Sequence, residues 1–322
     1  MTSKIEISHR TIVFILGLLA LLWLIVQIRE ILFLLFISFI LMSTFRPLID
    51  RWEKWRLPRA LGILLLYGIV FGLFSSALAG VIPSLVIQST RLMQSLPGLV
   101  TKLLPYWDIN LQSFIQQAAP LGENIVRLTV GIFSNIVTTI TVLVFTFYFL
   151  LERSRLEKFL LEMLGAEVGK RTIDIIQKVE KSLGSWLLGE FVLMFCIGLF
   201  SYLGLLLLKV DFALPLAILA GLLEIVPTIG PIISGIPAVL VALTTSPLLA
   251  LATVALYFIL HQTENNLLVP LVMRKAVGLP PLVTIVALMV GGKLAGLAGA
   301  VLAVPIVVML QVILSELLAK KT

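Results

Sequence analysis

Long runs of apolar residues separated by short polar connections make up most of this chain. The first two runs, 11–26 and 31–45, are divided by only four residues, which include Arg29 and Glu30, and a third run follows at 60–83. A membrane-spanning helix needs about 20 apolar residues, so we expect these runs to enter or cross a bilayer. Because the first two runs are short, we favour a helical hairpin with Arg29 and Glu30 at its tip. The alternative is one long tilted helix that buries this charged pair.

Two later segments depart from the apolar pattern. In 84–124, polar residues and three prolines accompany leucines spaced by three, four and seven residues, which predicts a small amphipathic helical subdomain on or outside the membrane. The apolar residues 125–151 then form a span. In 152–187, acidic and basic residues alternate around one apolar stripe, which predicts a helix that is solvated on its other face. We therefore divide the chain into 1–83, 84–124, 125–151, 152–187 and a C-terminal membrane core at 188–322.

The segment 217–243 is long enough to cross a bilayer but is interrupted in its middle. It contains one carboxylate, Glu224, followed by a run of helix-breaking residues: Pro227, Gly230, Pro231, Gly235 and Pro237. Each proline inside a helix removes a backbone hydrogen bond. Unwound backbone at membrane depth is tolerated only where protein or a watery cavity surrounds it. Broken helices of this kind form substrate and ion sites in secondary transporters.

Glu224 is the main candidate for function, because an ionisable carboxylate beside unwound backbone can bind a proton or a cation. The neighbouring break supplies four further candidates: Pro227, Thr228, Gly230 and Pro231. The alternative for Glu224 is a structural ion pair with Lys293 or Arg127. Glu190 is the first residue of the preceding span, 190–208, and we expect it at the membrane interface.

A second polar interruption follows the apolar residues 248–260. It begins with His261 and provides four candidate side chains: Gln262, Glu264, Asn265 and Asn266. Such groups either bind a polar solute or hold neighbouring helices together by hydrogen bonds. His261 has the chemistry of a proton relay near neutral pH, whereas a single histidine at the end of a span is more typical of an interfacial residue.

The last apolar region, 281–318, has about 38 residues and is too long for one straight crossing. We expect a pair of helices, or a re-entrant piece followed by a span. Gly292 and Gly296 are four residues apart, which predicts a close helix-packing face. Lys293 lies between them, and we expect it either to pair with a buried carboxylate or to contact solute.

Composition supports a membrane protein, since 60% of residues are hydrophobic and only 13% are charged, against about half and a quarter in soluble domains. The net charge of +7 comes largely from basic residues in two connections, 46–59 and 153–181. That distribution orients a membrane protein with its N- and C-termini in the cytoplasm, and does not indicate a nucleic-acid partner. We predict an all-α, polytopic helical membrane protein with about seven or eight transmembrane or re-entrant helices.

Several kinds of chemistry find no support in the sequence. The single cysteine allows no intrachain disulfide and no cysteine-based metal site, and the two histidines are far apart. The sequence around Gly165 has three residues between glycines and Arg171 after the lysine, unlike a phosphate-binding loop. Catalytic Ser/Lys, Asp/Asp or His-Glu-x-x-His sets are missing from the apolar runs. We therefore expect no cofactor, no metal and no enzymatic activity.

Three ordered motifs resemble the autoinducer-2 exporter family, the PerM-type predicted permeases. They are the sequence 223–231, the polar residues 262–266 followed by Val269-Pro270, and the glycines of 291–299 followed by Ala303-Val304-Pro305. The motifs cover the last third of the chain, and the hydropathy layout is similar along its whole length. Many family members have Asn where this chain has Glu224, so ion coupling through that carboxylate need not be common to the family.

The resemblance implies a transporter of the bacterial inner membrane, with a homo-oligomer as one arrangement. Family members are linked to export of a quorum-sensing signal and, in other cases, to Na⁺/H⁺ antiport. We expect a secondary transporter or permease that lies in the lipid bilayer and moves a small polar solute or cation, with H⁺ or Na⁺ coupling. The alternatives are a passive channel and a membrane scaffold that transports nothing.

Overall fold

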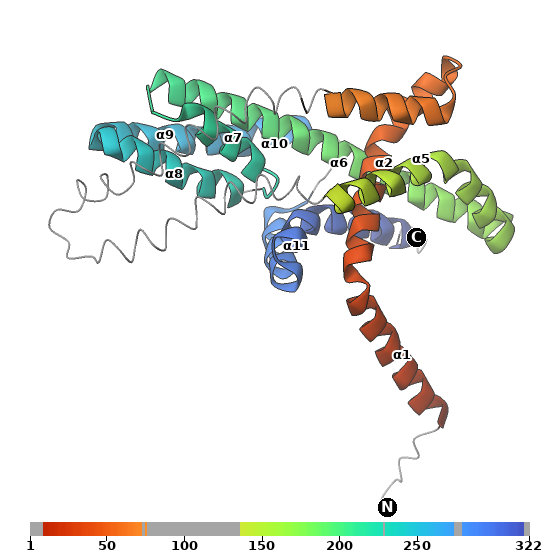
Figure 1. Cartoon of the computed structure of the whole chain (residues 1–322). Helices are drawn as coiled ribbons and strands as arrows, with labels where there is room; N and C mark the ends of the chain where they lie inside the picture. The colour runs from red at the N-terminus through yellow and green to blue at the C-terminus, as the bar shows by residue number, and fades with distance from the viewer. Residues whose placement is uncertain (1–8, 73–74, 76–135, 228, 274–278, 319–322) are drawn as a thin grey trace, which may run out of the picture.

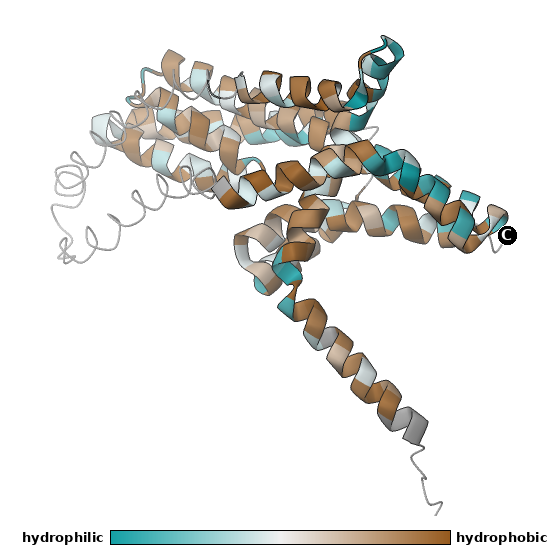
Figure 2. Ribbon diagram, turned by 45° about the vertical axis from the view of Figure 1, so that its right-hand side comes forward, coloured by the Kyte–Doolittle hydropathy of each residue, from teal (hydrophilic) through white to brown (hydrophobic). Residues whose placement is uncertain are grey.

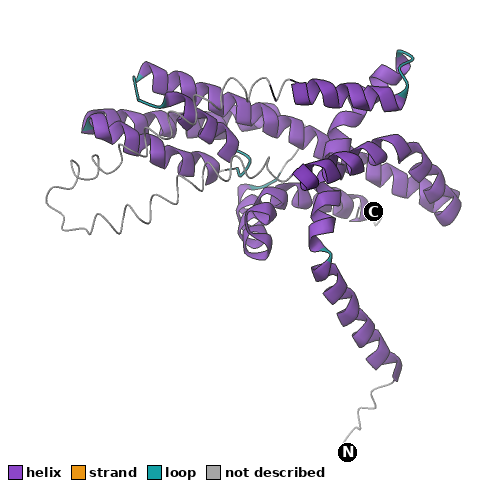
Figure 3. Ribbon diagram, viewed as in Figure 1, coloured by secondary structure: helices purple, strands orange, loops and turns teal. Residues whose placement is uncertain are grey.

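The computed structural model describes residues 9–72, 75, 136–227, 229–273 and 279–318 (Figure 1). All the regular structure within these ranges is helical, as Figure 3 shows, and they contain no strand. The predicted all-α class is therefore confirmed. The subdomain expected at 84–124 lies outside the described residues, and so does the first part of the span at 125–151.

The N-terminal helices do not form the expected hairpin. Helix α1 (His9–Gln27) and helix α2 (Arg29–Lys54) are separated by Ile28 alone, and α1 extends away from the other helices in continuation of α2 (Figure 1). The amide of Ile28 donates to Leu24 O at 2.9 Å and that of Leu32 donates to Ile28 O at 3.0 Å, so the helical hydrogen bonds continue across the junction. No glycine or proline lies there to stop them, and the arginine and glutamate that follow Ile28 are good helix formers.

A bundle forms from α2, the helix Arg59–Gly72 and α5 (Ile136–Leu164). Helix α2 ends at a tight turn in which Arg56 has a φ of 65°, so the chain reverses before the next helix. The side chains buried between the three helices are Met42, Ile49, Ile63, Leu66 and Leu150. Helix α5 continues without a break from the apolar span into the charged segment and ends at Leu164.

Helix α6 (Ala166–Leu207) begins in the charged segment and continues through the centre of the molecule. Its glycines allow close approach of four other helices. An added Cβ at Gly184 would lie 2.6 Å from Ser43 O of α2, and one at Gly189 would lie 2.8 Å from Met273 Sδ. Gly198 faces α7 and Gly204 faces α9 in the same way. Small residues of this kind let helices in a membrane pack backbone to backbone.

The predicted break near 217–243 is confirmed. Helix α7 (Ala213–Leu223) ends at Glu224, and helix α8 (Ile229–Thr245) begins after a short turn. A Cβ at Gly230 would collide with the carbonyl oxygen of Leu223, so glycine lets the two helix ends approach closely. Helices α7 and α8 pack against each other and lie beside α6 and α9 (Pro247–Thr263) (Figure 1).

The second polar motif forms a π-helical turn, η1 (Glu264–Leu268), between α9 and α10 (Val269–Met273). The amide of Val269 donates to Glu264 O, a bond that spans five residues. Pro270 has no N–H to continue an α-helical ladder and would crowd the carbonyl four residues earlier, which favours the wider turn before it.

The last region folds back on itself. This agrees with the expected pair of helices, or re-entrant piece followed by a span, and excludes one straight crossing. Within α11 (Pro281–Leu318) the backbone leaves the helical conformation at Ala295 and at Gly296, whose φ is 61°. A Cβ at Gly291 or at Gly299 would collide with the carbonyl oxygen of the other. The packing face predicted from Gly292 and Gly296 was wrong, because nothing lies within 4 Å of a Cβ at either residue, and the glycines in contact are Gly291 and Gly299.

The described helices have the lengths and surfaces of a polytopic membrane protein. Among them, 4 could cross a membrane by length and composition, although the last is interrupted at Ala295 and Gly296: Arg29–Lys54, Val137–Leu164, Ala166–Leu207 and Leu282–Leu318. The helix surfaces are largely apolar, and hydrophilic residues gather mainly toward one side of the molecule (Figure 2). An apolar outer surface of this extent fits lipid rather than water as the surrounding medium.

Candidate functional site

Three glutamates from distant parts of the sequence come together inside the protein. Glu190 lies on α6, Glu224 is the residue that ends α7, and Glu264 begins η1. Each of them is only 1% exposed. The carboxyl groups of Glu224 and Glu264 lie close enough to influence each other, and Glu190 interacts electrostatically with both. We call these three residues the buried carboxylate cluster.

Local structure explains why the three side chains meet. Gly221 of α7 packs against Gly198 and against Met194 O of α6, so the end of α7 is held close to α6. Gly189 of α6 packs against Met273 of α10, which brings the segment containing η1 to the same helix. Glu190 directly follows Gly189, and its carboxylate therefore lies where the ends of α7 and η1 approach α6.

The polar atoms of the cluster are largely without partners. Both carboxyl oxygens of Glu190, Oε2 of Glu224 and Oε2 of Glu264 accept no hydrogen bond from the described residues. None of the ion pairs in the described part of the chain contains Glu190 or Glu224. Buried carboxyl groups normally have such partners, because leaving a buried acceptor unpaired costs about 1–3 kcal/mol.

The contact between Glu224 and Glu264 has a chemical consequence. An ionised carboxylate can only accept hydrogen bonds, so two carboxyl groups can bond to each other only when one carries a proton. Three negative charges so close together in an apolar interior would also repel strongly. The arrangement is therefore suited to hold at least one exchangeable proton.

The structure separates the other predicted site residues into two groups. Pro227, Gly230 and Pro231 lie at the break beside Glu224, and Thr228 lies outside the described residues. The remaining polar candidates are exposed: Gln262, Asn265, Asn266 and Lys293. The expected pairing of Lys293 with a buried carboxylate is absent, since the ion pairs of the described residues do not include it. Arg127, the other suggested partner of Glu224, lies outside the described residues.

Glu190 is the residue of this site that sequence reasoning missed. Its place at the start of an apolar run made an interfacial position the simplest interpretation. The preceding glycine was the available signal, because a small residue next to an acidic one within a span allows another segment to approach the carboxylate. Which segment approaches could not be inferred from a linear pattern.

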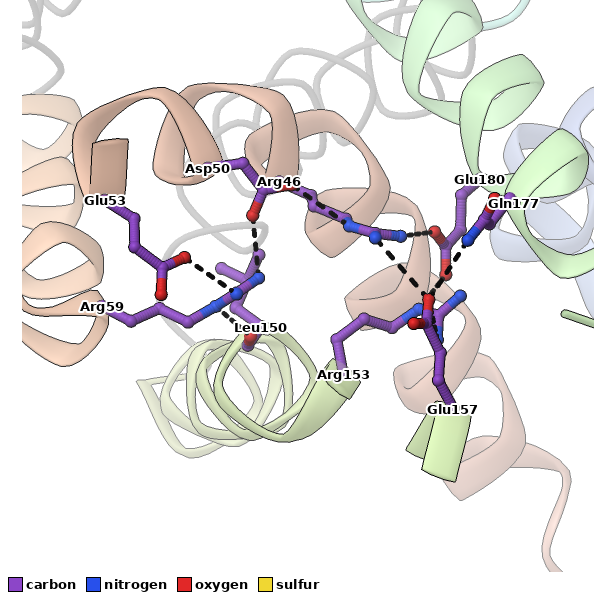
Figure 4. A network of polar contacts seen from close by, with 9 residues as sticks. All are labelled: Arg46, Asp50, Glu53, Arg59, Leu150, Arg153, Glu157, Gln177 and Glu180. Carbon is purple, nitrogen blue, oxygen red and sulfur yellow. Dashed lines mark hydrogen bonds and ion pairs between the residues drawn. The ribbon is translucent and has the colours of Figure 1, made fainter. Parts of the chain in front are cut away.

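A second polar group, the basic-end network, joins α2, α5 and α6 away from the carboxylate cluster (Figure 4). Arg153 Nε donates to Glu180 Oε1 at 2.6 Å, and Arg46 Nη1 donates to Glu180 Oε2. Arg153 also lies 3.1 Å from Glu157, and Arg59 lies 2.9 Å from Asp50. These ion pairs bind the two basic connections of the sequence to each other, which indicates a structural role.

Apolar outer surfaces, long apolar helices and a broken helix together define a multi-pass helical membrane protein. The comparisons agree with this class. A sequence model described as AI-2E family transporter matches residues 12–319, and the chain belongs to this family of membrane transporters.

Individual relatives are similar along most of their length. The chain is 30% identical to YueF of Bacillus subtilis over 295 residues, which cover 83% of this chain and 79% of YueF. It is 25% identical to the AI-2 transport protein TqsA of Escherichia coli over 294 residues, which cover 84% of this chain and 81% of TqsA. The resemblance found in the sequence motifs is thereby confirmed.

Proposed function

We propose that this protein is a proton-coupled secondary transporter of the bacterial inner membrane that moves a small polar solute. The observation that carries the proposal is the buried carboxylate cluster beside the break between α7 and α8. Among the described residues, Glu190 and Glu224 are buried and form no ion pair, which favours a functional role for these carboxyl groups. Intramembrane carboxylates of this kind are characteristic of proton relays in transporters.

Protons are favoured over Na⁺ as the coupling ion because of the contact between Glu224 and Glu264. Two carboxyl groups that approach each other in a buried site repel when both are ionised, and a proton on one of them relieves this repulsion. Exchange of that proton would change the charge of the interior beside unwound backbone. Such a change can be coupled to the movement of solute, since it alters the relative free energies of two conformations.

The proposed orientation has the basic-end network and the C-terminus in the cytoplasm, so α7 enters the membrane from the outside. Support comes from the basic-end network, which gathers the two basic connections, and from Lys178 Nζ, which lies 2.8 Å from Glu316 near the C-terminal end of α11. Helix α7 has 11 residues and a length of about 16 Å. This is roughly half of a hydrocarbon core of about 30 Å, so Glu224 would lie near the middle of the bilayer.

The candidate solute is AI-2, because the relative TqsA carries that name. Relatives in one family can differ in solute, since specificity depends on the residues of the site. Export of AI-2 is therefore the first solute assay to make once ion coupling has been measured.

The test is ion flux in proteoliposomes that contain purified protein and an internal pH-sensitive dye. We expect an imposed pH gradient to drive proton flux through the wild type, and Glu224→Gln to abolish it. Glu152→Gln is the matched control, because Glu152 is an exposed glutamate in a pair with Arg155. Undiminished flux in Glu224→Gln would refute a role for the cluster in coupling.

The ion and the mechanism are separated by two further arms of the same assay. A Na⁺ gradient imposed at constant pH should drive no flux if protons are the coupling ion. Flux of solute that ignores both gradients would identify a passive channel in place of a coupled transporter.

A further inference from the structure

We propose that His261 is the residue through which protons enter and leave the buried carboxylate cluster. This inference rests on the proposed proton coupling and assigns the proton path to a named side chain. His261 lies on α9 one turn before Glu264, at the edge of the cluster. It is a different kind of group from the three glutamates, because the neutral imidazole can accept a proton at one ring nitrogen and release one from the other.

Burial changes sharply between His261 and Glu264. The side chain of His261 is 27% exposed, whereas that of Glu264 is 1% exposed. Nδ1 of His261 lies 3.6 Å from Oε2 of Glu264, the oxygen that has no hydrogen-bond partner. A shift of less than 1 Å would make this contact a hydrogen bond. His261 therefore lies between the surface of the protein and the interior of the cluster.

The side chain of Asn265 is a second neighbour of the imidazole. Its Nδ2 donates to the backbone oxygen of His261 at 3.0 Å, which fixes the amide with its NH₂ group toward the ring. The same Nδ2 lies 3.1 Å from Nε2 and 3.4 Å from Nδ1 of His261. An NH₂ group can donate only to an unprotonated ring nitrogen, so Asn265 favours the neutral ring.

Protonation reverses this preference. In the imidazolium form both ring nitrogens carry hydrogen, so contact with the NH₂ group of Asn265 becomes repulsive and contact with the Glu264 carboxylate becomes attractive. The ring thus has an amide neighbour that suits its neutral form and a carboxylate neighbour that suits its charged form. Two partners of opposite preference are what a relay needs in order to both take and release a proton.

The transfer conserves atoms and charge. A hydronium ion gives a proton to a free ring nitrogen of His261, and water leaves. The N–H bond at Nδ1 then breaks as an O–H bond forms at Oε2 of Glu264, and the ring becomes neutral again. Glu264 then passes a proton to the neighbouring carboxyl group of Glu224, and no other reactant is required.

The titratable groups around this path come from four elements. Glu264 on η1 is the nearest to His261, Glu224 at the end of α7 lies behind it, and Glu190 on α6 completes the cluster. Tyr257, one helical turn before His261 on α9, is buried and beside Ser201. The acidic groups all lie on the inner side of His261, so a proton that reaches the ring is drawn inward.

The experiment compares proton flux in proteoliposomes for the wild type, His261→Gln, Glu224→Gln and His9→Gln, with and without added imidazole buffer. General acid–base groups typically contribute about a hundredfold or more in rate, and we expect His261→Gln to lose at least tenfold. Diffusible imidazole should restore much of that flux, because it can carry protons to the vacated and partly exposed position. It should restore none in Glu224→Gln, and His9→Gln should equal the wild type.

Several results would overturn the inference. Unchanged flux in His261→Gln beside an inactive Glu224→Gln would remove His261 from the path and leave the proposed function standing. Lost flux without rescue by imidazole would assign His261 a structural role only. No proton flux in the wild type would reject both proposals together. His261→Asn provides the same test if the glutamine variant does not elute as folded protein on size exclusion.

Discussion

Glu180 is the residue whose loss should be most costly in the basic-end network. It is buried, with its side chain 5% exposed, and it accepts hydrogen bonds from Arg153 and Arg46. Replacing it with leucine removes the charge and leaves the guanidinium of Arg153, which is 3% exposed, inside the protein. An unpaired charge at such a position is the main source of destabilisation when a buried ion pair is broken.

The magnitude follows from what remains around Arg153. Breaking a buried ion pair costs about 3–5 kcal/mol. Glu157 Oε1 stays 3.1 Å from Arg153 Nη1 and offsets part of the loss, and Arg46 is 24% exposed and can be solvated. We therefore expect the lower end, about 3 kcal/mol, which lowers the ratio of folded to unfolded protein by about a hundredfold.

The assay is reversible unfolding in mixed micelles with increasing SDS, followed by tryptophan fluorescence and circular dichroism. Glu152→Leu is the control, because its pair with Arg155 is exposed and worth at most about 1 kcal/mol. The double variant Arg153→Met/Glu180→Leu should recover part of the loss, since it leaves no unpaired charge at Arg153. A Glu180→Leu variant no less stable than the control would refute the view that this network holds α2, α5 and α6 together.

Two further predictions concern packing and charge. Gly221→Leu should destabilise the protein by about 1–3 kcal/mol, because its Cβ would lie 2.8 Å from Met194 O; thermal unfolding in detergent measures this, and Gly17→Leu is the control, with nothing within 4 Å of its Cβ. Equal melting of the two variants would contradict the close contact of α6 and α7. Lys293→Gln should leave proton flux in proteoliposomes unchanged, since Lys293 is exposed and outside the ion pairs of the described residues. A loss of flux would instead support the pairing of Lys293 with a buried carboxylate that was first expected from the sequence.

The hydrophobic pattern predicted those parts of the fold that depend on local chemistry. The prolines and glycines after Glu224 predicted a break near this point, and the chain does leave the helix between α7 and α8 around Pro227, although Gly235 and Pro237 lie within α8. The length of 281–318 required a reversal somewhere, although the contact proved to be Gly291 with Gly299 and not the register expected from spacing. The helix junction at Ile28 was misjudged, because two charged residues suggested a turn while their helix propensities favoured continuity.

The candidate site was only partly accessible to sequence reasoning. Glu224 and Glu264 were singled out as charges within apolar segments, and that criterion does not depend on the fold. Their proximity, and the participation of Glu190, depend on how α6, α7 and η1 are arranged in space. Contacts between residues far apart in one sequence leave no mark in its periodicity, which is why a partner such as Lys293 was chosen by charge and proved to lie elsewhere.

The π-helical turn changes which side of one membrane segment faces α6. Successive residues of an α-helix turn by about 100°, so Tyr257 and Glu264, seven residues apart, share a face. Met273 is nine residues after Glu264 and would lie on the opposite face of an uninterrupted α-helix. The additional residue taken up by η1 rotates the following turns back by about 100°, which reduces the offset of Met273 from about 180° to about 80°, and Met273 contacts Gly189 of α6. The one inserted residue thus allows both Glu264 and Met273, which lie on the two sides of the π-helical turn, to approach α6.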